Sequence, residues 1–281
     1  MFKFNFNSDD NDDNRDDLKI KDDSTCFVEC QEIQASTNRQ YDLKNVRTKL
    51  LKINNTNINY VCNESLLDIL KNTQDLSEDS ILKAEEKHSD LLPAVYEGGL
   101  KIWECTYDLL DYISENRVGF KDKLVLDLGC GAGILGIHSL LHQAQYCWFQ
   151  DYNKDVLENI TIPNIELNCK ESLDRCRFFS GDWHSFVEYS EKNYPEEKFD
   201  YILTSETIYN TGYYKKLHLV FEKLLAKNGV VLLAAKSFYF GVGGGVHLFQ
   251  DFVDSKKVFK HTTCWQSTEG VKREILKLEF M

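Results

Sequence analysis

The pattern of apolar and polar positions divides the chain into two unequal parts. Residues 7–23 are mostly Asp, Asn and Lys, so they carry too little apolar surface to fold. We therefore predict a disordered acidic tail over residues 1–40. An N-terminal extension is expected over 41–90, with short strands at 49–53 and 58–62 followed by a polar, helical connector. The main ordered domain is expected over 91–281.

Beyond residue 91, short apolar runs alternate with segments of helical period. Runs typical of buried strands lie at 124–128, 146–149, 176–180, 199–204 and 230–235, and helical patterns cover 213–226 and 247–253. Such alternation predicts an α/β fold with a doubly wound, mostly parallel sheet covered on both faces. The last two strands, at 258–265 and 274–280, are expected to form an antiparallel hairpin at its edge.

The first strand of this domain runs directly into a glycine-rich turn. Gly129, Gly131 and Gly133 follow the strand, and a helical pattern begins at Ile134. Glycine allows a left-handed backbone in such a turn and lets a ligand lie against bare backbone. The pattern therefore predicts a nucleotide-like ligand at this helix N-terminus.

Asp127 bears on which nucleotide this is. Residues 131–136 match the dinucleotide fingerprint, so a nicotinamide dehydrogenase remains open, as does a turn that binds nothing. A carboxylate two residues before the first glycine repels a pyrophosphate, whereas it suits the ammonium and sulfonium groups of S-adenosylmethionine. We therefore favour S-adenosylmethionine as the cofactor, bound at Asp127, Gly129, Gly131 and Gly133.

Two later strands are also followed by carboxylates. Asp151 stands 151 − 131 = 20 residues after Gly131, a spacing at which an acid binds the ribose hydroxyls of either cofactor. In the motif Gly181-Asp182-Trp183, the carboxylate is suited to an adenine amino group and the indole to covering the ring. A plain turn with a surface tryptophan is the alternative.

Composition and charge narrow the class of protein. With 281 residues, 42% of them hydrophobic, the chain can bury a sizeable core. The net charge of −12 argues against direct binding of nucleic acid and suits a basic protein substrate. The nine cysteines contain no CxxC pair, and His138 and His142 lack a third ligand, so no metal site or disulfide framework is predicted.

The N-terminus and the hydropathy profile bear on location. Residues 1–14 lack the apolar core of a signal peptide, and no apolar run approaches membrane-spanning length. We expect a monomer without a membrane partner, located in the cytoplasm and nucleus, with the nucleolus as a candidate site.

Five segments in chain order share a pattern with one enzyme family. They read LLPAVYEGGLKIWECTYDLL (91–110), FQDYN (149–153), SGDW (180–183), TSETIYN (204–210) and KSFYFGVGGGVHLFQ (236–250). Together they resemble the eukaryotic histidine protein methyltransferases. That family belongs to the class I, seven-β-strand, S-adenosylmethionine-dependent superfamily and methylates a histidine of a large-subunit ribosomal protein. The resemblance covers 91–281 and implies a Rossmann-like methyltransferase domain there, acting in ribosome biogenesis or translation.

Position by position, the resemblance implies cofactor contacts from five stretches of chain. They are Ile102, Trp103, Glu104, Cys105 and Thr106; Gly129; Gln150, Asp151 and Tyr152; Gly181, Asp182 and Trp183; and Ser205. These positions agree with the pattern-based interpretation, because ligands of an open α/β sheet bind at the carboxyl ends of its strands.

The predicted chemistry lies after the fourth strand. Residues 206–209, Glu-Thr-Ile-Tyr, resemble the Asp-x-x-Tyr element of related protein methyltransferases, with Glu in place of Asp. A histidine acceptor aims one imidazole nitrogen at the methyl carbon and needs an acceptor for the proton on the other. Glu206 is predicted to fill that role while Tyr209 or Asn153 fixes the ring. The alternative is that Glu206 caps the following helix.

Two further features carry weaker expectations. A glycine cluster lies near the C-terminal end of the domain and is followed by a histidine; the residues are Gly241, Gly243, Gly244, Gly245 and His247. They are predicted to form a shaped loop over the acceptor site, and a flexible linker is the alternative. His88 lies 102 − 88 = 14 residues before the cofactor segment, so self-methylation is expected if the connector folds back. A plain surface histidine without a role is the favoured interpretation, and self-methylation is the alternative.

Three classes of function remain open from the sequence. The leading hypothesis is a protein-histidine N-methyltransferase that modifies the tele nitrogen. The second is a methyltransferase of the same fold acting on lysine or a small molecule. The third is a non-catalytic cofactor-binding protein. A nucleic-acid amine methyltransferase is disfavoured, because the fourth strand lacks an Asn-Pro-Pro-aromatic element.

Overall fold

The computed structural model describes residues 27–35, 41–73, 80–87, 89, 91–92 and 95–281. The first 26 residues of the predicted tail and the candidate self-methylation residue His88 lie outside this range. Among the described helices, none has the length and apolar character needed to cross a membrane.

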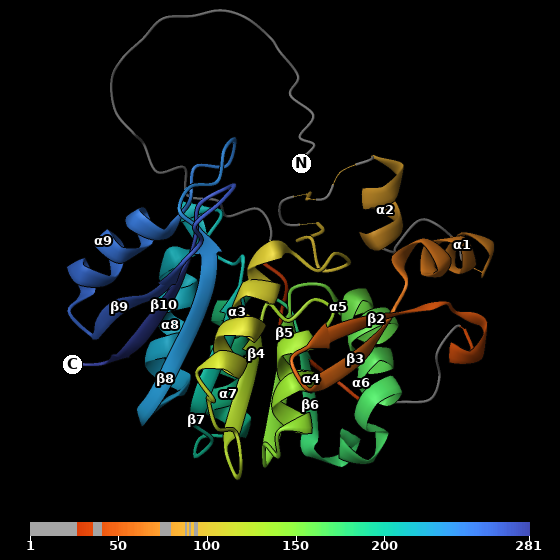
Figure 1. The fold of residues 1–281 in the computed structure, drawn as a ribbon, viewed down its shortest axis with the longest axis horizontal. Coiled ribbons are helices and arrows are strands. Elements are labelled where there is room, and N and C mark those ends of the chain that lie inside the picture. Colours follow the sequence, from red (N-terminus) through yellow and green to blue (C-terminus); the bar gives the residue numbers. More distant parts are fainter. Residues whose placement is uncertain (1–26, 36–40, 74–79, 88, 90, 93–94) are drawn as a thin grey trace, which may run out of the picture.

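One mixed sheet forms the centre of the molecule (Figure 1). Its strands are β1 (Gln31–Ile33), β4 (Leu124–Leu128), β5 (Tyr146–Asp151), β6 (Cys176–Ser180), β7 (Phe199–Ser205), β8 (Leu225–Lys236), β9 (Phe259–Gln266) and β10 (Arg273–Phe280). They lie in the order β1-β6-β5-β4-β7-β8-β10-β9. The five strands from β6 to β8 run parallel, whereas β1, β10 and β9 each pair antiparallel with a neighbour.

Helices cover both faces of the sheet because its central strands are apolar on both sides. Two hydrophobic clusters lie on opposite faces of the sheet. Val125 of β4 and Leu203 of β7 belong to the first, and their neighbours Leu126 and Ile202 belong to the second. The first cluster includes residues of α3 (Glu104–Glu115), α4 (Ile134–Leu141) and α6 (Ile162–Cys169). The second includes residues of α7 (Trp183–Asn193), α8 (Tyr214–Leu224) and α9 (Val246–Lys256).

The predicted α/β class and the C-terminal hairpin are confirmed. Strands β9 and β10 pair antiparallel, and it is β10, the last in sequence, that pairs with β8. The hairpin therefore extends the sheet with its final strand inside and β9 at the edge. Shorter helical segments complete the part after β5: α5 (Lys154–Val156), a π-helical turn (Leu157–Thr161), and 3-10 turns at Lys170–Arg175 and Thr211–Tyr213.

The N-terminal extension packs on the main domain. Strands β2 (Thr48–Ile53) and β3 (Thr56–Val61) form a hairpin that lies beside α4 and α6 (Figure 1). The backbone N–H of Val61 donates to Asn164 Oδ1 at 2.8 Å, and the buried Ile58 belongs to the same cluster as Ile165. A 3-10 turn (Leu43–Asn45) precedes this hairpin, and α1 (Asn63–Thr73) and α2 (Ser80–Glu86) follow it.

Strand β1 differs from the prediction of a disordered tail over residues 1–40. Gln31 pairs with Ser180 and Ile33 with Phe178, so this segment forms the edge strand beside β6. Cys30 and Ile33 are buried. Three residues are too short a run to produce a recognisable period in the sequence. The structure therefore makes residues 27–35 part of the folded domain.

Candidate active site

The predicted glycine turn lies between β4 and α4. Gly131 has φ of +48°, in the left-handed region that favours glycine. A Cβ atom there would lie 3.0 Å from the carbonyl oxygen of Gly99. The segment before α3 therefore passes directly over the turn, and a side chain at this position would force the two apart.

Asp151, at the end of β5, holds the same turn from the other side. Its Oδ2 accepts a hydrogen bond from the backbone N–H of Gly131 at 2.9 Å, and its Oδ1 accepts from the N–H of Asn153 at 3.0 Å. Burial raises the pKa of this carboxyl to about 6. The predicted acid is thus placed beside the predicted glycine.

Asp127 has a different environment from the one expected. Its Oδ2 accepts a hydrogen bond from the backbone N–H of Gly136 at 2.8 Å, and only 1% of the residue is exposed. Gly136 is the third residue of α4, so this bond satisfies one of the helix's unpaired N–H groups. Burial raises the pKa of the carboxyl to about 8. The carboxyl faces the helix and is largely neutral at pH 7, so its charge gives no argument against a pyrophosphate.

We expect Asp127→Asn to stabilise the protein increasingly as pH rises from about 4 to about 8. In the folded chain the carboxyl keeps its proton up to about pH 8, whereas in the unfolded chain it ionises near its ordinary value of 3.8, so folding stability falls across this interval. Asparagine still accepts the Gly136 N–H bond but carries no titrating proton. Relative to the native chain, the variant should gain several kcal/mol at most, with about 6 kcal/mol as the upper bound.

Urea unfolding at a series of pH values checks this prediction. The exposed Asp122, replaced by asparagine, is the matched control and should leave the pH slope unchanged. Parallel stability curves for the native chain and Asp127→Asn would show that the buried carboxyl does not titrate as described.

The residues predicted to bind the adenine base are brought together at the carboxyl ends of β5 and β6. Gln150 donates from Nε2 to the Gly181 carbonyl at 2.8 Å, and its Oε1 accepts from the Trp183 indole at 2.8 Å. Asp182 caps α7, accepting from the N–H of His184, while its Oδ2 lies 2.6 Å from Lys216 Nζ. The indole is therefore fixed in place, and both carboxylate oxygens of Asp182 already have partners.

The segment that precedes α3 is fastened by Asn153. The Oδ1 of Asn153 accepts from the backbone N–H of Glu97 at 3.0 Å, and its Nδ2 donates to the carbonyl of Val95 at 2.8 Å. Both ends of this buried amide are thus used within the protein. The prediction that Asn153 contacts the acceptor ring is therefore not supported, and the residue positions the segment.

The other predicted residues of this segment lie close to the strand ends. The Trp103 indole donates to the Gly98 carbonyl at 3.1 Å, and the hydroxyls of Thr106 and Ser205 lie 2.8 Å apart. Ile102 and Tyr152 are partly buried, and Cys105 is fully buried, so its thiol pKa is raised well above the ordinary value. Glu104 is the first residue of α3, and its carboxylate pairs with Lys236.

A small pocket opens beside these residues. It is lined by Leu91, Glu97, Gly98, Trp103, Glu206, Tyr209, Tyr239 and Val242. Aromatic side chains thus form its walls together with two carboxylates. The Glu97 carboxylate accepts hydrogen bonds from the hydroxyls of Tyr209 and Tyr213. A flat, partly polar ring is the kind of group that such walls accommodate.

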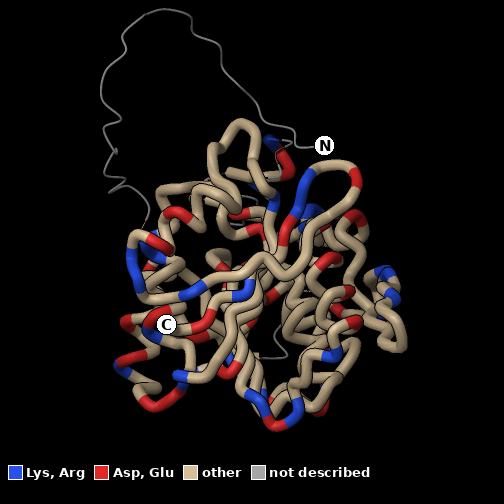
Figure 2. The backbone as a smooth tube through the Cα atoms, turned by 60° about the vertical axis from the view of Figure 1, so that its left-hand side comes forward, with Lys and Arg blue, Asp and Glu red and all other residues tan. Residues whose placement is uncertain are grey.

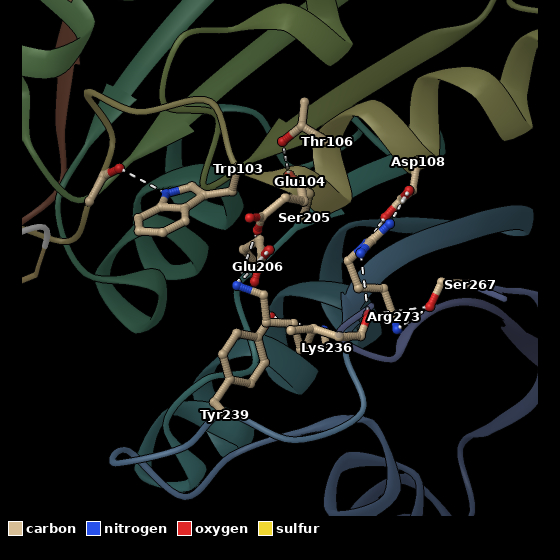
Figure 3. A network of polar contacts seen from close by, with 12 residues as sticks. Trp103, Glu104, Thr106, Asp108, Ser205, Glu206, Lys236, Tyr239, Ser267 and Arg273 are labelled. Atoms are coloured by element: carbon tan, nitrogen blue, oxygen red, sulfur yellow. Dashed lines mark hydrogen bonds and ion pairs between the residues drawn. The ribbon is translucent and has the colours of Figure 1, made fainter. Parts of the chain in front are cut away.

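Glu206 occupies a strained position at the end of β7. Its φ of +60° is unusual for a residue with a side chain, and its backbone N–H donates to Ala234. Only 8% of the residue is exposed. Oε2 accepts a hydrogen bond of 2.5 Å from Tyr239, whereas Oε1 receives no hydrogen bond from a described residue and lies 3.6 Å from Lys236 Nζ (Figure 3). The alternative that Glu206 caps the next helix is excluded, because α8 begins at Tyr214.

The glycine cluster packs against this pocket. The N–H of Gly244 donates to the carbonyl of Tyr209 at 2.9 Å, and a Cβ at Gly244 would lie 2.2 Å from the carbonyl oxygen of Ile208. Gly241 and Gly243 have φ of +88° and +83°. The cluster is a shaped loop, as predicted, and not a linker. Its histidine, His247, is 72% exposed and 3.8 Å from Glu274, outside the pocket lining.

Glu97, Tyr239 and Lys236 contact the predicted catalytic residues but were not assigned by the sequence interpretation. Glu97 and Tyr239 stand inside recognised motifs, and their neighbouring glycines were the available signal. Lys236 opens the motif at 236–250, but nothing in that motif indicated its proximity to Glu206, which arises only when β7 and β8 pair.

Comparison with known proteins places this chain in a family. A family model described as lysine methyltransferase matches residues 76–239. A Bos taurus protein named histidine protein methyltransferase 1 homolog is 48% identical over 228 residues, covering 72% of this chain and 61% of the relative. Histidine protein methyltransferase 1 of Schizosaccharomyces pombe is 31% identical, covering 76% of this chain and 74% of that protein. The chain belongs to the histidine protein methyltransferase family.

Membership confirms the family resemblance drawn from the five motifs. This member of the histidine protein methyltransferase family spans about three fifths of the length of its mammalian relatives. A solved structure described as a S-adenosylmethionine-dependent methyltransferase from Streptococcus mutans superposes with a TM-score of 0.53 at 13% identity, over 82% of this chain and 55% of that one. That likeness shows a shared methyltransferase fold.

Proposed function

We propose that this protein is a protein-histidine N-methyltransferase that uses S-adenosylmethionine. The observation that carries the proposal is Glu206 Oε1, a buried carboxylate oxygen without a hydrogen-bond donor among the described residues, in the wall of an aromatic pocket. Lys236 Nζ, 3.6 Å away, compensates the charge of this oxygen, while its hydrogen-bonding capacity stays available to a donor from a ligand. The N–H of a neutral imidazole is a donor of the right shape and polarity.

The proposed cofactor site is the edge formed by the glycine turn, Asp151 and the Gln150–Trp183 pair. The curated relatives are named histidine protein methyltransferases, and the fold is one that binds ligands at this end of its strands. Asp151 would contact the ribose, and the fixed indole of Trp183 would lie against the base. The methyl group would then point toward the pocket that contains Glu206.

In the proposed reaction, one imidazole nitrogen attacks the methyl carbon of the sulfonium. A C–N bond forms, the C–S bond breaks with its electron pair going to sulfur, and the ring becomes a methylated imidazolium. Glu206 accepts the hydrogen bond from the other ring nitrogen, which we assign as the pros position, and stabilises the charge as it develops. A histidine is already mostly neutral near pH 7, so the site needs no strong base.

The proposed target is a histidine in a basic protein, with a large-subunit ribosomal protein as the specific candidate and the cytoplasm and nucleus as the location. A chain of net charge −12 attracts such a partner by long-range electrostatics. Charged residues of both signs are spread over the described chain (Figure 2), so the net balance rather than a single patch carries this argument.

Labelled methyl transfer to lysate proteins, followed by amino-acid analysis, tests the proposal. Methylhistidine is the expected product. Lysine is the second candidate acceptor, because the matching family model is described as lysine methyltransferase. Recovery of the label only as methyllysine would replace the proposed acceptor, and failure to label any protein would favour a non-catalytic cofactor-binding role.

Asp151→Ala is expected to raise the Kd for S-adenosylmethionine about 10- to 150-fold, equivalent to about 1.5–3 kcal/mol for charge-assisted hydrogen bonds. The substitution removes the proposed ribose acceptor and also the bond that holds the N–H of Gly131. Calorimetry with S-adenosylmethionine measures the change. Asp155, a partly buried carboxylate that accepts from the N–H of Ile81 instead, is the control when replaced by alanine. Equal affinities for both variants would remove Asp151 from the cofactor site.

A further inference from the structure

Lys236, the last residue of β8, places a buried cation behind the pocket. Its side chain is 8% exposed, and Nζ lies 3.3 Å from Glu104 Oε2 and 3.6 Å from Glu206 Oε1. The same nitrogen is 5.6 Å from the ring centroid of Trp103 and 5.8 Å from that of Tyr239. Figure 3 shows Lys236 directed at Glu206 from β8. The ammonium therefore adjoins three of the residues that line the pocket.

We propose that Lys236 determines acceptor specificity, so that the pocket takes a neutral imidazole and rejects a lysine ammonium. This inference rests on the proposed function, because it concerns the acceptor bound at Glu206. The acceptor type is an open question for this fold, since the family model that matches residues 76–239 is described as lysine methyltransferase while the curated relatives are named for histidine.

The geometry brings any acceptor nitrogen close to this cation. A nitrogen that donates to Glu206 Oε1 lies within about 6.5 Å of Lys236 Nζ, the sum of the 3.6 Å ion-pair distance and a hydrogen bond of about 2.9 Å. At neutral pH a lysine acceptor brings a second positive charge to this point, whereas an imidazole is mostly neutral. Repulsion between like charges is strong where water is excluded.

Each carboxylate around the pocket already has a partner within the protein. Glu206 is already paired with Lys236, and Glu104, with 59% of its side chain exposed, is held by the same ammonium. The oxygens of Glu97 accept from the hydroxyls of Tyr209 and Tyr213. An entering ammonium thus meets one carboxylate that already has a cation and another that already has two donors.

The same contact has a favourable side for a histidine acceptor. A buried carboxylate is destabilised by loss of water unless a cation or hydrogen bonds compensate. Lys236 supplies that compensation from behind Glu206 without donating a hydrogen bond to Oε1. The oxygen thus remains available to a neutral N–H group. Lys236 acts through Glu206, so it is a positioning residue for the reaction.

Binding of two side-chain analogues tests the inference without requiring the natural substrate. We would measure Kd values for 4-methylimidazole and butylammonium with the full chain saturated with S-adenosylhomocysteine, at about pH 8.5, where the first is mostly neutral and the second charged. The indole N–H signal of Trp103, assigned with Trp103→Phe, reports occupancy of the pocket. The native chain should bind butylammonium at least tenfold more weakly than 4-methylimidazole.

Lys236→Met removes the charge while keeping the length of the side chain, and Lys236→Gln is a second neutral variant. Each should lower the ratio of the butylammonium Kd to the 4-methylimidazole Kd at least tenfold, whereas Lys236→Arg keeps the charge and should preserve the ratio. Unchanged cofactor affinity shows that a variant is folded. If the ratio is the same in the folded neutral variants as in the native chain, the inference is overturned. Methylation of lysine instead of histidine by the native protein overturns the proposed function as well.

Discussion

Replacing Glu206 by alanine is expected to lower kcat about 100- to 1,000-fold while the Kd for S-adenosylmethionine changes by less than about threefold. A preorganised group that stabilises charge in the transition state has effects of this size when it is removed. The Glu206 carboxylate lies in the pocket wall beside Tyr239, and its Oε1 is the oxygen without a hydrogen-bond donor among the described residues. Single-turnover kinetics at saturating cofactor measure the chemical step directly.

Two further substitutions make the result for Glu206 interpretable. Glu222→Ala removes a half-exposed carboxylate of α8 whose ion-pair partner among the described residues is His218, and kcat should stay within about twofold of the native value. Tyr239→Phe removes the hydroxyl that donates to Glu206 and should produce an intermediate loss, since the carboxylate stays but is less firmly oriented. A Glu206→Ala protein that binds cofactor poorly but reacts normally at saturation would move this residue to the cofactor site.

Gly244→Ala is expected to destabilise the protein by about 1–3 kcal/mol and to reduce activity even at temperatures where the variant is folded. The added methyl would lie 2.2 Å from the Ile208 carbonyl oxygen and 2.4 Å from the Tyr209 carbonyl carbon, so backbone atoms must separate. That movement breaks the bond between the N–H of Gly244 and the carbonyl of Tyr209, and it displaces Tyr209 from the pocket wall.

Gly243→Ala provides the comparison for this loop. Its φ of +83° makes alanine strained, but a Cβ there meets nothing within 4 Å. The expected cost is therefore the backbone penalty alone, about 1–2 kcal/mol, with the pocket intact. Thermal unfolding and steady-state kinetics on both variants separate stability from site geometry. Equal kcat for the two variants would show that the loop does not shape the acceptor pocket.

The sheet could be predicted closely because its strands have clear ends in the sequence. Strands β4 and β6 occur at the predicted residues, since each is a short apolar run that stops at a glycine or beside one. Strand β8 is longer than predicted at its N-terminal end, where polar residues 227–229 interrupt the apolar pattern. The three residues of β1 carry no period at all and are ordered only by pairing with β6.

The site was predictable in position but only partly in detail. The carboxyl ends of parallel strands meet at one edge, which correctly grouped Asp151, Gln150 and Glu206 near the glycine turn. The orientation of the Asp127 side chain could also have been predicted. Asp127 and Val125 are two residues apart on β4, so their side chains lie on the same face of the sheet, and the hydrophobic cluster on that face includes α4. The roles of Asn153 and Lys236 were not predictable, since each depends on partners far away in sequence.

The pairing of β1 with β6 has a consequence for how this chain is made. Gln31 must wait for Ser180, its partner 149 positions later, before the sheet edge can close during synthesis. Without β1, the outer edge of β6 would present unpaired backbone groups, which are a template for intermolecular association. A recombinant fragment that starts at residue 41 would keep the β2–β3 hairpin and the methyltransferase motifs and lose the strand that covers this edge. Low solubility of such a fragment, with the longer chain remaining soluble, is the outcome that this topology leads us to expect.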